Sequence, residues 1–512
     1  MKRSLLSIAN KLALPCVFAL ALFARLWLFG QVPGDINQDE AFAGYEAWAL
    51  LNYGVDSSGH PWPVYLTAWG SGMNALESYL MLPFIAAFGL KVWVIRLPQL
   101  TVSLLSVWAA YCLGRRLGDR HTGLICALLL AICPWHILMS RWGLESNLAP
   151  GFMLFGLCFF LRGLEDGRFL CLSALMYGLA LYAYAAIWAV MPVILLLELI
   201  YGAAVGRLRA GGCLWLSGLI LALLAAPLLL FLLVNYGYMD EIVLPYFSIP
   251  KLPELRGGEI SLGQVPENLG LLLRIVLGRS DGLIWNSPSR FGIVYLLSLP
   301  LMLLGAGQAV RLSVLSLRRR EPSPAAPLLI QLLGGIMLSA TISVNVNRVN
   351  ILLPVLVIFA GLGVDALRRL AGRAAVVAMV GAYLALFLGF QCYYFTDYRR
   401  EAEQAFTYGA EQAIEAALGH RGPVYVCGEL LYPKLLFYSR LSPLDFAGTV
   451  EYRVYPAKYL EPRSFDRFSY DLDTADPAEG VYILSAGTDL SALEARGYTA
   501  ETYGGFTVAY IQ

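Results

Sequence analysis

The sequence predicts an α-helical polytopic membrane protein followed by a small extracytoplasmic α/β domain. Of its 512 residues, 58% are hydrophobic and only 14% are charged, and the mean hydropathy is +0.63. Many apolar runs reach about 17 to 22 residues, the length that a helix needs to cross a bilayer. Towards the C-terminus charged residues become frequent and the apolar runs shorten to strand length.

The apolar runs define about eleven transmembrane helices. The first run, from Leu12 to Gly30, ends without a small-residue cleavage site, so we interpret it as an anchor rather than a signal peptide. The predicted spans are 12–30, 97–117, 121–139, 148–163, 168–183, 185–202, 213–234, 291–309, 326–343, 350–367 and 374–391.

Basic residues predict the orientation of these spans in a plasma membrane. Alternate connections carry arginine clusters, and these fall on the same side as the basic N-terminus. The positive-inside rule makes that side cytoplasmic and places the C-terminus outside. A further apolar piece, Tyr79 to Leu90, is too short to cross, and counting it as a span would reverse every later loop. We therefore expect it to be a helix at the outer surface. The clusters are Lys2, Arg3, Lys11, Arg115, Arg116, Arg120, Arg162, Arg168, Arg207, Arg209, Arg311, Arg318, Arg319, Arg320, Arg368, Arg369 and Arg373.

Two domains follow from this topology. Residues 1–391 form the transmembrane module, with a long first outer loop over 31–96 and a polar outer insertion over 235–290. Residues 392–512 form the extracytoplasmic α/β domain, with helical periodicity at 399–418 before the strand-like runs.

Charge and cysteine usage exclude several classes of function. The 37 Lys+Arg residues balance 36 Asp+Glu residues, so there is no electrostatic case for binding nucleic acid. The four histidines are scattered without metal-ligand spacing. Seven of the nine cysteines lie in apolar runs, which leaves Cys392 and Cys427 as the candidates for a disulfide.

An acidic stretch in the first outer loop is the predicted chemical centre. Asp35, Asp39 and Glu40 lie within six residues of each other, and Glu145 follows at the next outer connection. Carboxylates from two loops can act as a general base and its orienting partner. Asp39 and Glu145 can alternatively hold a divalent cation, Mg²⁺ or Mn²⁺, through hard oxygen ligands. The structural alternative for Asp39 and Glu40 is capping of the helix that begins there.

Arginines at the outer boundary are candidates for binding a lipid phosphate. Arg348, among polar Asn residues in an apolar region, is the first candidate, and Arg141 and Arg290 are the others. Each of them could instead extend to lipid headgroups. Tyr182 and Tyr184 could stack on a sugar, although tyrosines at an interface need no such role.

These residues resemble those of a known family. The chain is similar to bacterial polytopic glycosyltransferases of the GT-C type, in the superfamily of protein O-mannosyltransferases and aminoarabinose lipid A transferase (glycosyltransferase family 39-like). The resemblance covers roughly residues 12–390 and departs from the family at Trp69-Gly70-Ser71-Gly72. Its motifs are Asp39-Glu40, Phe88-Gly89, Arg96-Leu97-Pro98, Pro134-Trp135-His136, Ser140-Arg141-Trp142-Gly143-Leu144-Glu145, Asn347-Arg348 and Leu352-Leu353-Pro354.

The resemblance implies inverting transfer of a sugar from a polyprenyl-phosphate donor to a hydroxyl of a protein or glycolipid acceptor at the outer face. It implies that Asp39 is the catalytic carboxylate, that Glu145 is the second acidic residue and that Arg348 contacts the donor phosphate. Two other classes stay open. One is a transporter or flippase of lipid-linked sugars, although the chain lacks a convincing internal repeat. The other is a polysaccharide ligase or polymerase, which the 235–290 insertion would suit.

Overall fold

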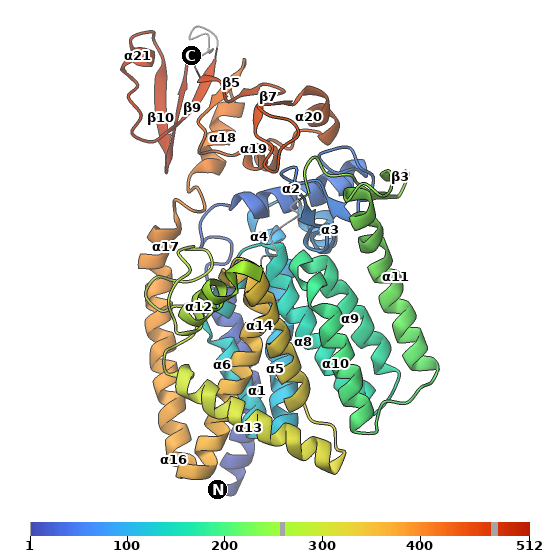
Figure 1. Ribbon diagram of the computed structural model, residues 1–512. Helices are drawn as coiled ribbons and strands as arrows, with labels where there is room; N and C mark the ends of the chain where they lie inside the picture. The colour runs from blue at the N-terminus through green and yellow to red at the C-terminus, as the bar shows by residue number, and fades with distance from the viewer. Residues whose placement is uncertain (1, 256–261, 473–479, 512) are drawn as a thin grey trace.

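A helical bundle forms the lower part of the molecule, and the C-terminal sheet domain forms the upper part (Figure 1). The computed structural model describes residues 2–255, 262–472 and 480–511. Each predicted span overlaps a helix. The helices concerned are α1 (Lys2–Leu26), α5 (Leu97–Leu117), α6 (Arg120–Ala131), α7 (Pro134–Met139), α8 (Glu145–Gly163), α9 (Phe169–Ala183), α10 (Met191–Ala204), α11 (Gly212–Asn235), α13 (Ser298–Arg319), α14 (Ala325–Thr341) and α16 (Leu353–Phe395).

Length and composition identify a multi-pass membrane protein. Within the described ranges, four helical segments are long and apolar enough to cross a membrane: 92–117, 212–235, 298–319 and 346–395. Five shorter apolar helices accompany them. The last segment covers two predicted spans, 350–367 and 374–391. Helix α16 is broken between them at Gly372, which has a φ of 80°. The count of about eleven spans stays a prediction.

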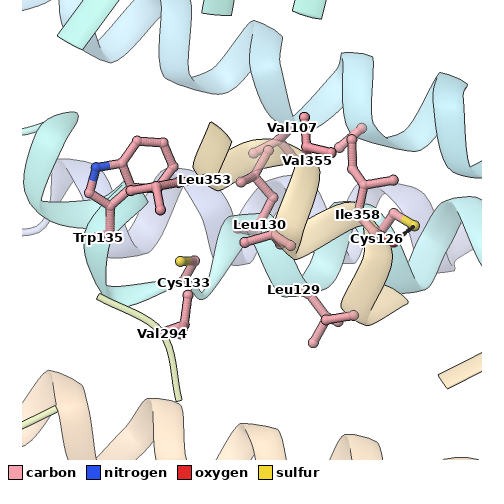
Figure 2. Packing of buried hydrophobic residues seen from close by; sticks show 14 of the residues in the cluster. Val107, Cys126, Leu129, Leu130, Cys133, Trp135, Val294, Leu353, Val355 and Ile358 are labelled. Atoms are coloured by element: carbon pink, nitrogen blue, oxygen red, sulfur yellow. Dashed lines mark hydrogen bonds between the residues drawn. The ribbon is translucent and has the colours of Figure 1, made fainter. Parts of the chain in front are cut away.

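Close contacts between helices hold the bundle together. Figure 2 shows α5, α6 and α16 packed around Val107, Leu130 and Ile358, where the Cys126 thiol donates to the Ile358 carbonyl. Helices α13 and α16 approach so closely that a Cβ at Gly305 would lie 1.7 Å from the Phe359 carbonyl oxygen. Small residues of this kind allow membrane helices to pack backbone to backbone.

The first outer loop folds into a layer between the bundle and the upper domain (Figure 1). Asn37 begins its main helix, because its side-chain oxygen accepts from the Asp39 N–H at 3.0 Å while Glu40 accepts from the Asn37 N–H at 3.2 Å. The apolar piece at 79–90 is largely helical, as expected. The elements are α2 (Gln38–Tyr53), β1 (Tyr65–Leu66), β2 (Met73–Asn74), α3 (Leu76–Phe88) and α4 (Val92–Ile95).

The outer insertion over 235–290 contacts the first outer loop where Ser248 pairs with Pro63. Residues 256–261 of the insertion lie outside the described part of the chain. The elements of the insertion and of the short segments 185–189 and 346–352 are η1 (Ala185–Ala189), β3 (Ile242–Leu244), β4 (Phe247–Ile249), η2 (Leu262–Gln264), α12 (Val265–Val276), α15 (Val346–Val349) and η3 (Asn350–Leu352).

The C-terminal region contains the predicted mixture of helices and strands. A seven-stranded mixed sheet has the order β10-β11-β9-β5-β8-β7-β6, in which β5 runs parallel to both of its neighbours. The strands are β5 (Val424–Val426), β6 (Glu451–Tyr452), β7 (Pro462–Phe465), β8 (Phe468–Ser469), β9 (Val481–Ser485), β10 (Thr499–Tyr503) and β11 (Phe506–Tyr510). The helices are α17 (Asp397–Ala402), α18 (Ala410–Leu418), α19 (Tyr432–Ser439), α20 (Pro443–Thr449) and α21 (Ser491–Glu494).

The upper domain docks on the first outer loop through α19. Phe42 of α2 packs edge-on against Tyr432, with ring centroids 5.7 Å apart, and Phe437 touches the backbone at Gly44. This contact fixes the position of α2, and with it the acidic residues at its start. Cys392 and Cys427 do not pair, because both are free thiols.

Candidate functional site

Two cavities meet between the bundle, the first outer loop and the upper domain. The smaller, which we call the Asp39 cavity, has a volume of about 340 Å³. The larger, the Arg348 cavity, has about 550 Å³. They share Gly72, Leu144 and Glu145 in their walls. The Asp39 cavity is otherwise lined by Gln38, Asp39, Trp69, Met73, Leu431 and Tyr459. The Arg348 cavity is lined among others by Tyr65, Asn74, Tyr184, Trp188, Phe231, Asn345, Asn347 and Arg348.

The two predicted acidic residues come from helix starts. Asp39 is the second residue of α2, where the Asn37 cap fixes its backbone. Glu145 is the first residue of α8, and its Oε2 accepts a hydrogen bond from the Asn74 N–H. Both side chains are half-buried. Both carboxyl groups therefore lie at the positive end of a helix dipole, which attracts negative charge.

Arg348 lies on the short helix α15 at the wall of the larger cavity. The Asn345 side chain caps this helix by accepting from the Arg348 N–H at 2.9 Å. The guanidinium donates to Ser343, and Asp281 of the outer insertion accepts from the Val346 N–H at 2.9 Å. Tyr184 lines the same cavity. The arrangement can therefore hold an anionic group beside an aromatic ring.

Glu40 faces the protein interior, although it follows Asp39 directly. It is fully buried, forms a salt bridge with Arg96 and accepts from the Gly143 N–H at 2.7 Å. Arg96 also donates to the Asp35 and Pro33 carbonyls at 2.7 and 3.0 Å. Because its oxygens are occupied by these partners, Glu40 holds the loop together rather than lining a cavity.

Glu77 is a buried carboxyl that the sequence did not single out as a site residue. It accepts from the Gln99 amide at 3.1 Å. Burial raises its pKa well above the ordinary value, the Gln99 hydrogen bond opposes that shift, and the nearby charges of Glu145, Glu40 and Asp39 add to it. Glu77 thus lies behind the cavity wall, in the same electrostatic field as the two cavity acids.

Arg141 and Arg290 lie away from both cavities. Arg141 is fully buried and donates to carbonyl oxygens at the end of α1, including those of Arg25 at 2.7 Å and Trp27 at 2.8 Å. Arg290 is exposed and pairs with Asp397 at 3.3 Å. The sequence alone does not show whether an arginine after an apolar run lines a cavity, as Arg348 does, or donates to backbone carbonyls, as Arg141 does.

Asp35 and Tyr182 also lie outside the two cavities. Asp35 accepts from the Gly409 and Glu411 N–H groups, at 3.1 and 3.2 Å, and from the Tyr438 hydroxyl at 2.6 Å. It therefore ties the first outer loop to the upper domain. Burial raises its pKa against these hydrogen bonds. The Tyr182 hydroxyl donates to the Leu224 carbonyl at 2.8 Å, and its ring lines a separate groove.

A divalent cation would receive few ligands from the protein. Across residues 2–255, 262–472 and 480–511, no group of three or more His, Cys, Asp or Glu side chains gathers as a metal site. Asp39 and Glu145 line one cavity, so a cation held by this pair would complete its shell from water or substrate oxygens, as Mg²⁺ commonly does.

Two residues that shape the cavities, Gly72 and Tyr459, were not predicted from the sequence. Gly72 has a φ of 89°, and a Cβ there would lie 2.4 Å from the Tyr65 ring. Its missing side chain leaves room where the two cavities meet. The two glycines of Trp69-Gly70-Ser71-Gly72 are the sequence feature that could have indicated this tight turn. Tyr459 comes from the upper domain, and no sequence feature connects it to Asp39.

The chain is similar to a known protein family and to several solved structures. The family model "Dolichyl-phosphate-mannose-protein mannosyltransferase" matches residues 76–231. None of the curated proteins matches the chain. Solved structures of ArnT from Cupriavidus metallidurans, in the apo state and bound to undecaprenyl phosphate, align with TM-scores of 0.54 and 0.53. Each is 16% identical and covers 99% of this chain and 98% of its own. An archaeal oligosaccharyltransferase, AglB from Archaeoglobus fulgidus, aligns at 12% identity over 84% of this chain and 63% of its own, with a TM-score of 0.46.

The match over residues 76–231 and the shared fold make the chain similar to multi-pass membrane glycosyltransferases of the GT-C class, which use lipid-phosphate sugars. Within that class, its predicted resemblance to the dolichyl-phosphate-mannose-protein mannosyltransferase family is confirmed, and its fold is that of ArnT over nearly the whole chain.

Proposed function

We propose that the protein transfers a sugar, with inversion, from a polyprenyl phosphate to an acceptor hydroxyl at the outer face of the membrane. The single observation that carries this proposal is that Asp39 and Arg348 line separate cavities sharing the Glu145 wall. Two substrates can thus approach one point from two sides. The basic cytoplasmic connections support the outer location, since the cavities adjoin the opposite end of the bundle.

The donor is assigned to the Arg348 cavity. Its apolar wall, with Phe231 and Leu232 of α11, suits the first prenyl units, and the Arg348 guanidinium suits the phosphate. Tyr184 and Trp188 lie on the same wall and offer ring faces to the sugar. Undecaprenyl phosphate and dolichol phosphate, seen in the structures of ArnT and AglB, belong to this chemical class of lipid.

The reaction then needs one base and one anion-stabilising group. Asp39 accepts the proton of the acceptor hydroxyl, and the resulting oxygen nucleophile attacks the anomeric carbon on the face opposite the phosphate. The bond from the anomeric carbon to the phosphate oxygen breaks, and its electron pair leaves with polyprenyl phosphate. Arg348 stabilises that leaving anion. Glu145, at the junction, accepts hydrogen bonds from sugar or acceptor hydroxyls and so orients them.

The acceptor is a protein or a glycolipid hydroxyl in the Asp39 cavity. Trp69 from the first outer loop and Tyr459 from the upper domain border this cavity. The domain at 392–512 therefore contributes to acceptor recognition, while the module at 1–391 supplies the acids and the donor site.

The test is to follow a carbon label at the anomeric position. Purified protein in vesicles receives a panel of polyprenyl-phosphate hexoses and pentoses, with a membrane extract as the acceptor source. We expect stoichiometric release of polyprenyl phosphate and a product of inverted anomeric configuration by NMR, with Asp39→Asn as the inactive control. Retained configuration, or movement of the intact donor across the bilayer without cleavage, would contradict the proposal.

A further inference from the structure

An apolar groove lies outside the proposed reaction site. Its volume is about 520 Å³, and it shares no lining residue with the Asp39 or Arg348 cavity. We call it the Tyr182 groove. Its walls come from the first outer loop, α3, α9, α11 and the β3–β4 hairpin. The lining residues are Trp62, Pro63, Val64, Leu76, Tyr79, Leu179, Tyr182, Leu224, Tyr246 and Phe247.

Two of the three tyrosines that line the groove, Tyr79 and Tyr182, donate their hydroxyls to backbone carbonyls. Tyr182 donates to the Leu224 carbonyl at 2.8 Å, and Tyr79 donates to the Pro63 carbonyl at 2.9 Å. Their rings, with Leu179 and Val64, leave a surface of carbon atoms. Such a surface favours an aliphatic chain over a sugar, because a sugar needs several hydrogen-bond partners.

The groove opens on the side of the molecule that faces lipid. Helix α11 is strongly apolar, yet only 22% of its most apolar window is buried within the protein. Helix α9 packs beside it, and the β3–β4 hairpin follows its upper end (Figure 1). Leu223 of α11 is 64% exposed and Tyr246 at the hairpin turn is 84% exposed. The exposed apolar surface of α11, with Leu223, therefore adjoins the groove, whose wall includes Leu224.

Three packed aromatic rings lie between the Tyr182 groove and the Arg348 cavity. Tyr65 stacks on Phe231 with ring centroids 4.5 Å apart, and Trp188 packs edge-on against both rings. These three residues line the Arg348 cavity, whereas Val64, the neighbour of Tyr65, lines the groove. A prenyl chain whose phosphate lies at Arg348 already has an apolar wall on its own side of these rings.

We propose that the Tyr182 groove binds one acyl chain of an outer-leaflet phospholipid. The chain lies between α9 and α11, and the Tyr246 ring sits at headgroup level, where aromatic residues are favoured. The bound chain supports the hairpin and the loop at 62–64, which border both the groove and, through Tyr65, the donor cavity. Occupancy of the groove does not depend on the proposed transfer reaction.

The experiment places a photocrosslinker at the rim. Tyr246→p-benzoylphenylalanine protein is reconstituted in vesicles of phosphatidylethanolamine and phosphatidylglycerol without polyprenyl lipids, then irradiated. We expect a mass increase of one phospholipid. The same substitution at Leu223 is the positive control for bulk lipid contact. At Tyr455, which is 66% exposed in the upper domain, it is the negative control.

A second variant separates a chain in the groove from lipid at the surface. Leu179→Trp fills the groove and is expected to remove most of the adduct from position 246 while leaving the adduct from position 223 unchanged. The proposal is overturned if position 246 gives no adduct while position 223 does, or if the adduct survives Leu179→Trp. It is also overturned if added polyprenyl phosphate replaces phospholipid in the adduct.

Discussion

Asp39 and Glu40 are consecutive residues of α2 that lie in opposite environments. Asp39 is half-buried and lines a cavity, whereas Glu40 is fully buried against Arg96. One residue turns a side chain by about 100° around a helix, so the two carboxylates point to different sides of the same turn. We call the interior side the buried polar layer, which consists of Glu40, Glu77, Arg96 and Gln99.

The arginines divide in the same way. Arg348 lies half-buried at a cavity, and Arg141 lies fully buried against backbone carbonyls. The charged groups near this end of the bundle are therefore of two kinds. Groups such as Asp39 and Arg348 border the cavities, and groups such as Glu40 and Arg141 fix the loops behind the cavity wall.

Asp39→Asn tests the cavity side of the comparison. Loss of a general base lowers a rate by about 10²- to 10⁴-fold, so we expect kcat to fall by that factor with an unchanged melting temperature. Transfer of a labelled sugar by purified protein, together with thermal unfolding in detergent, measures both quantities. Near-normal kcat in this variant would remove Asp39 from the mechanism.

Glu40→Gln tests the buried side. Removing one partner of a buried ion pair costs about 3 to 5 kcal/mol, because Arg96 keeps its charge without its carboxylate. We expect a much lower melting temperature and a reduced yield of folded protein, and the matched neighbour Asp39→Asn serves as the control. A variant as stable as the wild type would show that the Arg96 contact contributes nothing to the fold.

Arg348→Ala sharpens the division among the arginines. A hydrogen bond to a charged group contributes about 1.5 to 3 kcal/mol, so the donor KM should rise by roughly 10- to 100-fold. Arg290→Ala is the control, since its exposed pair with Asp397 is worth at most about 1 kcal/mol and lies away from the cavities. An unchanged donor KM in Arg348→Ala would move the phosphate site elsewhere.

Lys434 gives the effect that is smallest at any one pH near neutrality, a dependence of stability on pH. It is buried behind the acidic loop and donates to Thr407 at 2.6 Å. Burial lowers its pKa from 10.5 to about 8, against the nearby charges of Asp35, Glu40 and Asp39. Between these two pKa values Lys434 keeps its proton in the unfolded chain but loses it in the folded protein. The free energy of unfolding therefore rises with pH, by up to about 1.4 kcal/mol per pH unit.

The measurement is thermal unfolding of the wild type and Lys434→Met between pH 7 and pH 10. The variant should lose this component of the slope. Identical slopes would show that Lys434 titrates at the same pH in the folded and unfolded chains.

The sequence predicted the helices and singled out three charged residues that line the cavities, because both inferences depend on local patterns. Apolar runs of bilayer length located the helices, and charged residues after such runs pointed to Asp39, Glu145 and Arg348. The sequence did not distinguish Glu40 or Arg141 from these, because side-chain direction and burial arise only from tertiary packing. The contribution of Tyr459 depends on how the upper domain docks, which no local pattern encodes.

Donor binding by Asp39→Asn, measured beside its transfer rate, tests the central claim most directly. The proposed function assigns Asp39 to the acceptor side and Arg348 to the donor side, and the two residues line different cavities. The variant should therefore bind a labelled polyprenyl-phosphate sugar with the wild-type Kd and fail to transfer it. Loss of donor binding in this variant, or transfer at the wild-type rate, would contradict the account.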